Sequence, residues 1–367
     1  MNTIAAKGRR LLKFALALAV MSSVSSAPAF AKTDVHVLDV GQGLSVLVKS
    51  QDHYMLYDGG DRDRSDYVVS YLKQQGIAEL DYMIASHYDA DHINGLVGAL
   101  NTTSVKQVFA PEYTTDTKVF QSFRDTIATK SVPKKQPAVG STYPLGDATF
   151  QILSPAGTGY RDANDYSIAI RITDGDTSFL ITGDAEAAAE AEMCGSGLPL
   201  ESDVYVMGHH GSASSSSWDL LQKAVPEYAV LSCGTDNPYG HPHIESMEKL
   251  QAMEIPLFRT DRQGAIIAST DGAAITWNVS PCNDYSPGSA DDRPAQPQAQ
   301  DASQSAGTDN TAITETAEYI LNTSTKKIHY PGCRSAAQIK AENKRATSES
   351  RDSLIAQGYT PCKNCRP

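Results

Sequence analysis

The chain has 367 residues, of which 41% are hydrophobic and 20% charged, and its formal net charge is -12. A chain of this length can hold two or three domains and can bury a sizeable core. The excess of acidic residues, with a pI near 5.2, argues against a protein that coats nucleic acid or anionic membranes with its whole surface.

The N-terminus has the pattern of a secretory signal. Four basic residues between positions 7 and 13 precede an apolar run at 14–20, and small residues then lead to Ala29-Phe30-Ala31. The pattern predicts a signal peptide over residues 1–31 that is cleaved after Ala31, because the apolar run is too short for a permanent membrane span. We therefore expect a secreted, extracellular protein without stable membrane insertion. An uncleaved N-terminal anchor is the alternative.

Apolar and alternating runs over residues 32–282 predict one strand-rich domain in two halves. In the first half, strands are expected at 35–40, 44–49, 54–57, 82–85 and 108–109, and helices at 64–75, 92–100 and 119–129. In the second half, strands are expected at 149–153, 167–173, 178–182, 203–207, 228–232, 257–258, 264–269 and 273–277, and helices at 185–192, 218–224 and 244–253. This order predicts an α+β sandwich with helices outside and a site at one edge of the sheets.

The C-terminal part of the chain differs in composition. Residues 283–315 are rich in Pro, Ala, Gln, Ser and Asp and contain almost no large apolar side chain. Such a segment cannot bury enough surface to fold, so it is predicted to be a disordered linker. A separate small module is expected at 316–367.

Residues 86–92, Ser-His-Tyr-Asp-Ala-Asp-His, hold a dense group of potential metal ligands. His87 and Asp89 alternate along an extended segment, so both can face one ion. Asp91 and His92 turn the corner into the next helix and can reach a second ion. The alternative is a polar loop in which Asp91 caps that helix.

Three later loops carry further potential ligands. Asp184 follows an apolar strand, where its carboxylate can bridge two ions, although alone it is more typical of a helix cap. His209-His210 and His241 each follow a strand or lie in a loop, and singly each could be a packed core imidazole. Together, in this order after the 86–92 motif, they predict a two-metal site.

These motifs resemble a known family. The segment His87-x-Asp89-x-Asp91-His92, with Asp58-Gly59-Gly60 before it and Gly183-Asp184 after it, is similar to the metallo-β-lactamase fold. Segments 38–43, 181–186, 208–212 and 239–243 resemble the hydrolase domain of ComEC competence proteins and its secreted relatives. The resemblance covers about residues 32–279. It implies an αββα sandwich, a dinuclear metal hydrolase and DNA as substrate, since ComEC-type domains are associated with degrading the non-transported strand.

The resemblance also implies roles for single residues. The metal ligands would be His87, Asp89, Asp91, His92, Asp184 and His241, and the catalytic groups Asp91, His209 and His210. Asp184 would bridge two divalent ions, zinc or manganese, and His209 or His210 would either bind metal or protonate the leaving oxygen. Asp58 would orient a ligand. Asn164 and Ser167 would line the site, although turn chemistry explains both equally well.

Two departures from the family pattern affect the predicted chemistry. Asp89 stands where most of the superfamily has His, although Asp is usual in the ComEC branch, and a harder oxygen ligand shifts preference from zinc toward manganese. Leu44 replaces an Asp that the branch commonly carries. No histidine lies between Ile93 and Gly208, so His209 or His210 is the expected replacement for a ligand that many relatives draw from this interval.

The C-terminal module carries His329, Cys333, Cys362 and Cys365, a set that predicts a structural zinc site. In an exported protein, a disulfide between two of these cysteines is the alternative. The stretch 359–365 resembles the metal-binding domain of the Ada repair protein. Nine basic residues against three acidic ones between positions 326 and 367 indicate either a polyanion-binding patch or a solvated basic helix.

The remaining cysteines, Cys194, Cys233 and Cys282, are expected to form one disulfide and one buried thiol. The function expected from the whole sequence is a secreted metal-dependent phosphodiesterase or nuclease acting on DNA. A hydrolase of another bond, such as a lactone or thioester, and a non-catalytic polyanion-binding protein are the alternatives.

Overall fold

The computed structural model describes residues 33–288, 319–330, 336, 339–349 and 351–362. The predicted signal peptide, residues 289–315 of the predicted linker, and Cys333 and Cys365 lie outside the described residues. None of the helices within the described ranges is long and apolar enough to cross a membrane.

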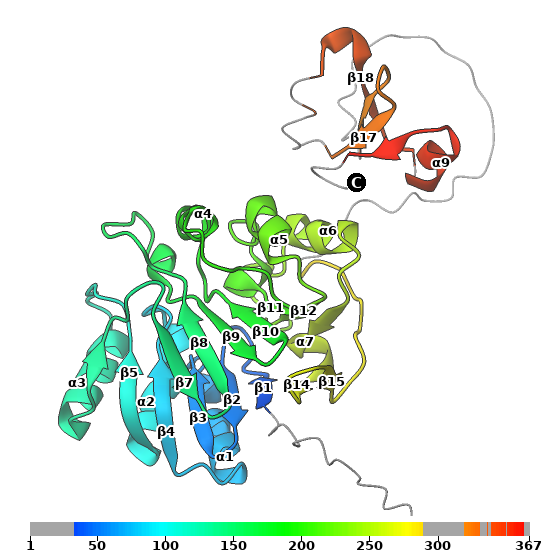
Figure 1. The fold of residues 1–367 in the computed structure, drawn as a ribbon. Helices are drawn as coiled ribbons and strands as arrows, with labels where there is room; N and C mark the ends of the chain where they lie inside the picture. The colour runs from blue at the N-terminus through cyan, green and yellow to red at the C-terminus, as the bar shows by residue number, and fades with distance from the viewer. Residues whose placement is uncertain (1–32, 289–318, 331–335, 337–338, 350, 363–367) are drawn as a thin grey trace, which may run out of the picture. The chain divides into compact units, whose positions relative to one another are not determined.

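Two β-sheets form the centre of the main domain (Figure 1). The first has eight strands in the order β15-β14-β1-β2-β3-β4-β5-β6. They are β1 (Thr33–Val37), β2 (Val46–Ser50), β3 (His53–Tyr57), β4 (Glu79–Ile84), β5 (Ser104–Phe109), β6 (Lys134–Lys135), β14 (Ile266–Thr270) and β15 (Ile275–Trp277). The β15 to β3 part is antiparallel and the β3 to β6 part is parallel.

The second sheet has seven strands in the order β13-β12-β11-β10-β9-β8-β7. They are β7 (Thr142–Leu145), β8 (Ala148–Ile152), β9 (Ile170–Asp174), β10 (Thr177–Ile181), β11 (Val204–Val206), β12 (Tyr228–Leu231) and β13 (Leu257–Arg259). Strands β7 to β10 pair antiparallel, and β10 to β13 pair parallel. Each sheet therefore has a parallel half in which strands run into helices at one common edge.

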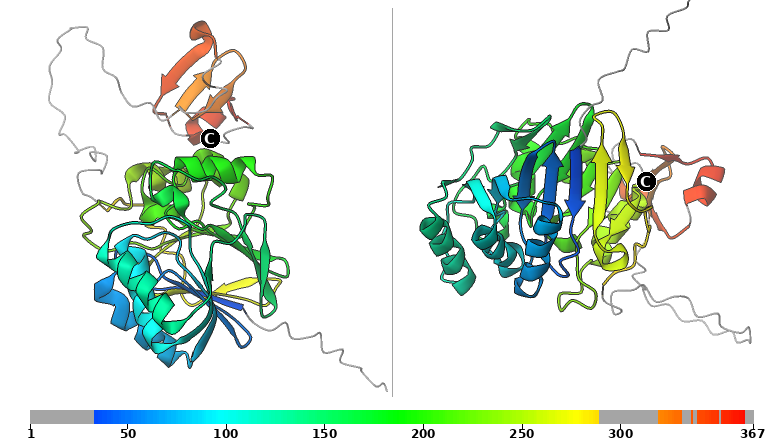
Figure 2. Two further views of the ribbon diagram at one scale, coloured as in Figure 1. Left: turned by 90° about the vertical axis from the view of Figure 1, so that its left-hand side faces the viewer. Right: turned by 90° about the horizontal axis from the view of Figure 1, so that it is seen from below.

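Helices cover the outer face of each sheet (Figures 1 and 2). On the first sheet they are η1 (Arg62–Arg64), α1 (Ser65–Gln74), α2 (Ala90–Thr102) and α3 (Lys118–Lys130). On the second they are α4 (Ala187–Gly195), α5 (Trp218–Ala224) and α6 (Ile244–Ala252). The connections contain η2 (Asn164–Tyr166), η3 (Gly208–Gly211) and α7 (Thr260–Gln263).

Strand β2 shows why the layers form. Val46 and Val48 point into the core between the sheets, whereas Leu47 points into the core between the first sheet and its helices. Successive strand side chains point to opposite faces, so a strand that is apolar on both faces is buried between two layers. The predicted αββα sandwich is confirmed.

The structure differs from the sequence prediction in three respects. Strand β14 pairs with β1 in the first sheet and β15 pairs with β14, so these two strands do not close the second half. The short strands β6 and β7 were not predicted. The folded domain extends beyond residue 282, because the Asn283 side chain accepts from the Leu257 N–H at 3.0 Å and the Gly288 N–H donates to the Pro242 carbonyl at 2.8 Å.

The expected disulfide among the main-domain cysteines is wrong. Cys194, Cys233 and Cys282 are free thiols in the structure, and Cys233 is completely buried.

A four-stranded sheet forms the C-terminal module, in the order β18-β16-β17-β19. Its elements are β16 (Tyr319–Asn322), β17 (Lys327–His329), η4 (Ala341–Asn343), β18 (Lys344–Thr347), α9 (Arg351–Ala356) and β19 (Thr360–Pro361). Tyr319, Leu321, Ile328, Leu354 and Tyr359 make its small apolar core.

Candidate metal centre

The 86–92 motif connects β4 to α2 at the sheet edge. Helix α2 begins at Ala90, and its N-cap residue, Asp89, makes no side-chain capping hydrogen bond. The interpretation of Asp91 as the cap is therefore wrong, because Asp91 lies within the first turn of the helix. Both carboxylates of the motif remain available for other partners, and neither His87 nor His92 is exposed to solvent.

Asp58 holds this loop in place from the end of β3. Its Oδ1 accepts from the Ser86 N–H at 2.8 Å, and its Oδ2 accepts from the Ser86 hydroxyl at 2.7 Å. The same Oδ2 lies 2.8 Å from Nδ1 of His92. This contact leaves Nε2 of His92 pointing away from Asp58, as expected for a carboxylate that orients a ligating histidine.

Helix α2 approaches the loop after β3 so closely that only glycine fits at the contact. A Cβ on Gly95 would lie 1.8 Å from the Gly59 carbonyl oxygen. The Gly59 N–H donates to the His92 carbonyl at 2.7 Å, and the Gly95 N–H donates to the Gly60 carbonyl at 3.1 Å. The conformation of the first ligand loop is thus fixed by backbone contacts on both sides.

The second sheet contributes Asp184, which follows β10. Gly183 adopts φ +56°, and a Cβ there would lie 2.7 Å from Cβ of Ser86, so glycine lets the two halves meet. Oδ2 of Asp184 lies 3.1 Å from Nε2 of His92 and 3.3 Å from Nε2 of His210. The Asp184 carboxylate therefore contacts a candidate ligand from the first sheet, His92, and one from the second sheet, His210.

His209 and His210 occupy left-handed backbone conformations, with φ of 46° and 53°. Such conformations are unfavourable for residues other than glycine and often occur at functional sites. His210 is buried, its Nε2 lies 3.4 Å from Oδ2 of Asp91, and its Nδ1 lies 3.1 Å from the Ser232 carbonyl. His209 is partly exposed and its Nε2 lies 3.7 Å from Oδ2 of Asp184.

Two overlapping groups could hold metal ions. One is His87, His92 and Asp184, and the other is Asp91, His92 and His210, and within each group the ligand atoms lie within 4.8 Å of one another. Among the described residues, Nε2 of His87 and Oδ1 of Asp184 are buried and have no hydrogen-bond partner. Buried polar atoms are costly when unpaired, so these two atoms fit a bound cation.

The directions of the pKa shifts indicate that the cluster attracts positive charge. Burial opposes protonation of His92, but the Asp184, Asp58 and Asp91 carboxylates outweigh it and raise the pKa of the imidazole. For His210 the same balance, dominated after burial by Asp184, raises the pKa to about 9. Burial opposes ionisation of Asp184, but the nearby histidines outweigh it and lower its pKa. The carboxylates that favour the protonated forms of His92 and His210 would also favour divalent cations bound in place of those protons.

The other predicted site residues lie around these groups. Asp89 is half exposed, with Oδ2 at 3.7 Å from Nε2 of His87. The Ser167 hydroxyl lies 3.5 Å from Nδ1 of His87 and accepts from the Asp184 N–H at 3.1 Å. Asn164 reaches the site only through Glu186, to which it donates at 3.3 Å.

His241 lies outside both groups. Its Nδ1 lies 3.3 Å from Nε2 of Gln42, and its ring centroid is 5.4 Å from that of His209. Burial, followed by the fields of His210 and His209, lowers its pKa to about 3. Its role as a metal ligand stays a prediction.

The sequence interpretation assigned no role to Ser86, Gln42 or Glu186. Oε1 of Glu186 lies 3.1 Å from Nδ1 of His209 and accepts from the Ser214 hydroxyl at 2.8 Å. Ser86 directly precedes His87, and Glu186 follows Asp184 by two residues. This closeness to predicted ligands is the only feature of the sequence that points to either residue. Leu44, which replaces a family Asp, packs in the core between the sheets.

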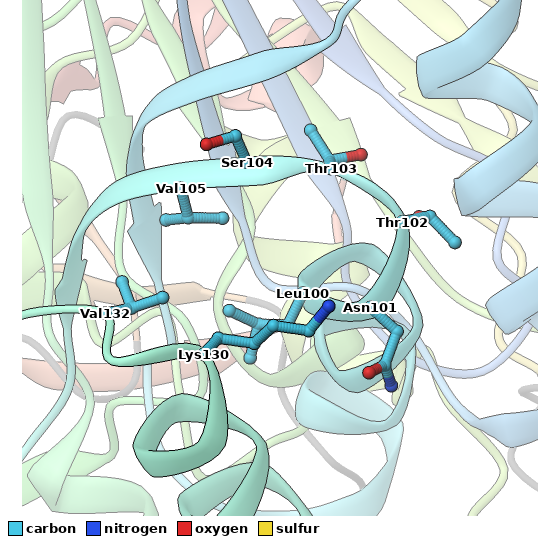
Figure 3. A pocket seen from close by; sticks show the side chains of 8 residues that line it. All are labelled: Leu100, Asn101, Thr102, Thr103, Ser104, Val105, Lys130 and Val132. Atoms are coloured by element: carbon cyan, nitrogen blue, oxygen red, sulfur yellow. The ribbon is translucent and has the colours of Figure 1, made fainter.

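A hollow of about 340 Å³ lies elsewhere, between the end of α2, the start of β5 and the end of α3 (Figure 3). Its lining includes Asn101, Thr102, Ser104 and Lys130, and none of the residues predicted for the site. It is at the opposite end of α2 from the ligand loop.

In the C-terminal module, His329 and Cys362 are both buried. Strands β17 and β19 are parallel neighbours, and the Cys362 N–H donates to the Ile328 carbonyl at 2.9 Å. These two predicted zinc ligands therefore lie at the ends of adjacent strands. The complete zinc site stays a prediction, because Cys333 and Cys365 lie outside the described residues.

Residues 38–235 match the model of the metallo-beta-lactamase superfamily. The chain belongs to this superfamily. This superfamily member is 32% identical to "Competence protein ComA" of Neisseria gonorrhoeae over 236 residues, which are 63% of this chain and 31% of the relative. It is 29% identical to "ComE operon protein 3" of Bacillus subtilis over 276 residues, 69% of this chain and 35% of the relative. It is 32% identical to "Recombination protein 2" of Haemophilus influenzae over 240 residues, 63% of this chain and 28% of the relative.

The predicted resemblance to ComEC-type competence proteins is confirmed by these relatives, although the superfamily member spans only about a third of their length. Among solved structures, the metallo-beta-lactamase fold protein YhfI of Bacillus subtilis aligns with a TM-score of 0.46 at 16% identity, covering 65% of this chain and 100% of YhfI. The likeness of the C-terminal module to Ada stays a prediction.

Proposed function

We propose that the protein is an exported, metal-dependent hydrolase that cleaves phosphodiester bonds in DNA. The observation that carries this proposal is the position of Asp184. Its Oδ2 lies within 3.3 Å of Nε2 of both His92 and His210, while its Oδ1 is buried and has no hydrogen-bond partner in the described part of the chain. A carboxylate with this placement suits the bridge of a two-metal site.

His87 and Asp89, together with Asp184, would hold one cation, and Asp91, His92 and His210, together with Asp184, would hold the other. Two divalent cations at these positions would supply Lewis acidity for water activation and for the charge that develops on phosphoryl oxygens. Asp58 fixes the ring of His92, and Ser167 contacts both His87 and Asp184.

His209 is the best-placed proton donor to a leaving oxygen. Its ring lies outside both ligand groups, its Nδ1 faces Glu186, and its Nε2 faces the cluster. A side chain held at one nitrogen and directed at the reacting centre with the other has the geometry of a general acid. The proposal therefore gives the two histidines different roles: His210 binds metal, and His209 is the general acid.

Two observations favour DNA as the substrate. The names of two relatives refer to competence and to recombination, processes that handle DNA. In the C-terminal module, Lys326, Lys344, Arg345 and Arg351 are exposed, which suits contact with a polyanion. Export rests on the N-terminal pattern alone.

The proposal is tested with the mature protein loaded with manganese or zinc. We expect about two metal ions per chain at saturation, hydrolysis of bis-p-nitrophenyl phosphate and cleavage of DNA. Asp184→Ala should abolish both activities, while Asp147→Ala, which removes an exposed carboxylate at a hairpin turn, should leave them unchanged. Full activity in Asp184→Ala, or a preference for lactone or thioester substrates, would overturn the proposal.

A further inference from the structure

Residues 283–288, the strap, pack on the main domain although their composition predicts a linker. At the start of the strap, the Asn283 side chain accepts from the Leu257 N–H at 3.0 Å. Two residues later, the Tyr285 hydroxyl donates to the Ile255 carbonyl at 2.7 Å. Leu257 belongs to β13, the edge strand of the second sheet, so the strap is attached along this edge.

The middle of the strap is held by Arg259, whose side chain is completely buried. Its Nη1 donates to the carbonyls of Asp284 at 2.9 Å and Ser286 at 2.6 Å. Its Nε and Nη2 donate to the Asp261 carboxylate at 3.0 and 2.9 Å. A buried guanidinium is costly unless its donors are paired, so the two strap carbonyls help to stabilise this charge.

The strap ends against the backbone of the loop that carries His241. The Gly288 N–H donates to the Pro242 carbonyl at 2.8 Å. A Cβ on Gly288 would lie 2.0 Å from the carbonyl oxygen of His241 and 2.8 Å from that of Gly240. Only glycine therefore allows the strap to approach the loop this closely.

The opposite side of the same loop contacts the turn that carries His209 and His210. A Cβ on Gly211, the next residue of that turn, would lie 2.7 Å from Cβ of Pro242. The His243 N–H donates to the Gly211 carbonyl at 3.0 Å. The loop is thus packed between the strap on one side and the histidine turn on the other.

The position of the His241 ring depends on this backbone. The ring centroid lies 5.4 Å from that of His209 and 6.2 Å from that of His210. Asn237 accepts from the His241 N–H at 3.0 Å and donates to the His241 carbonyl at 2.6 Å. The strap packs against that same carbonyl, so a shift of the strap would move the imidazole relative to the cluster.

We propose that Gly288 is a positioning residue, through which the strap holds the His241 ring in place beside the metal cluster. This inference rests on the proposed function. A site is precise only when the residues around it fix the rotamers and backbone of its side chains. The strap and His241 both lie beyond residue 235, where the match to the superfamily model ends, so this support comes from outside the matched range.

The first test is Gly288→Ala in the full-length, metal-loaded protein. Because a carbon atom approaches a carbonyl oxygen to about 3.3 Å, the methyl group would push the two backbones apart by about 1 Å. Displacement on this scale should lower kcat/KM for DNA by up to about 100-fold. Gly195→Ala at the end of α4 is the matched control, because a Cβ there meets nothing within 4 Å, and it should act like wild type.

A double-mutant cycle shows whether the strap acts through His241. Rates are measured under single-turnover conditions with excess enzyme, so that residual activity is detected. In a His241→Ala background, Gly288→Ala should cause little further loss, since the ring that it displaces is already absent. An equal loss in both backgrounds would overturn the inference, because it would indicate a general effect on the fold. Unchanged activity in Gly288→Ala alone would overturn it as well.

Hydrogen exchange of the metal-free protein tests the strap without catalysis. The N–H groups of Gly240, His241 and His243 are hydrogen-bonded, and Gly288→Ala should increase deuterium uptake over residues 237–243. Uptake in α3, which is remote from the strap in sequence, should not change. Uptake over 237–243 equal to that of wild type would overturn the inference. Absence of metal-dependent phosphodiester hydrolysis in wild type would instead overturn the proposed function, so the two failures are distinguishable.

Discussion

Nδ1 of His209 lies 3.1 Å from Oε1 of Glu186, on the side of the imidazole opposite the metal cluster. The Ser214 hydroxyl and the Asn164 amide also donate to Glu186. These hydrogen bonds fix the position of the carboxylate independently of His209. The pair fixes the ring of His209 with Nε2 directed toward Asp184.

Replacing Glu186 with Ala should therefore lower kcat for DNA about 10- to 100-fold, a typical effect of removing the partner of a catalytic histidine. Hydrolysis of bis-p-nitrophenyl phosphate should change little, because p-nitrophenolate leaves without a proton. Metal content, measured by mass spectrometry, should be unchanged. Asn164→Ala removes a weaker hydrogen bond to the same carboxylate, of 3.3 Å, and should have a smaller effect. Ser214→Ala is unsuitable as a control, because the Ser214 hydroxyl also lies 3.2 Å from Nδ1 of His209. A loss of metal in Glu186→Ala would show that His209 is a ligand.

Asp58→Asn should reduce the affinity for metal about 10- to 100-fold, because the amide cannot accept from all three groups that now contact the carboxylate. Asn is the suitable replacement since Asp58 has a φ of 54°, a conformation that Asn tolerates. Competition with a fluorescent chelator measures the change. Asp61→Asn alters a nearby carboxylate that contacts Arg62 and Asn94, and it should bind metal normally.

Asp89→His should shift the metal preference toward zinc, because imidazole replaces a hard oxygen donor. Proteins refolded with equal manganese and zinc should show a higher zinc fraction in the variant than in wild type. An unchanged ratio would mean that Asp89 does not bind metal, in agreement with its absence from both close ligand groups.

Burial raises the pKa of the Cys194 thiol to about 11 and that of Cys233 to about 12. Thiolate, the reactive form, is therefore scarce in the folded protein until the pH is far above the ordinary thiol pKa. We expect slow alkylation by iodoacetamide at pH 8 and rapid alkylation of Cys194, Cys233 and Cys282 in denaturant without reductant. Resistance in denaturant that reductant removes would reveal a disulfide.

Cys362→Ser should remove one zinc ion per chain without affecting metal in the main domain, if the module binds zinc through His329 and its cysteines. Elemental analysis of wild type and variant measures this difference. Cys282→Ser, which changes a main-domain thiol remote in sequence from the predicted zinc ligands, is the control. Equal zinc content in wild type and Cys362→Ser would contradict the predicted site.

Much of the fold could be predicted because each strand and helix has a clear local pattern. Strand β10 and helix α6, for example, fall within one or two residues of the predicted bounds. The pairing of β14 with β1 could not be predicted, because it joins residues more than 200 positions apart and depends on packing between layers. Strand β6 has two exposed lysines, so periodicity gives no signal for it.

The residues of the candidate site were also predictable only in part. His87, His92 and Asp184 could be found from ligand density and strand ends, because such positions meet at one sheet edge. The separation of His209 from His210 could not be predicted, because it arises from two consecutive left-handed residues that send adjacent side chains to different partners. Glu186 was missed because its partner is far along the chain.

The close contact at Gly183 and Ser86 has a consequence for how the protein acquires its metal. His87 and His92 come from the first sheet, and Asp184 and His210 from the second, so neither sheet alone presents the full ligand set. Tight metal binding must follow the docking of the two sheets, since binding energy is available only to the assembled site. Under the proposed function, the cations present in the compartment where the chain completes its folding are therefore the ones that compete for the site.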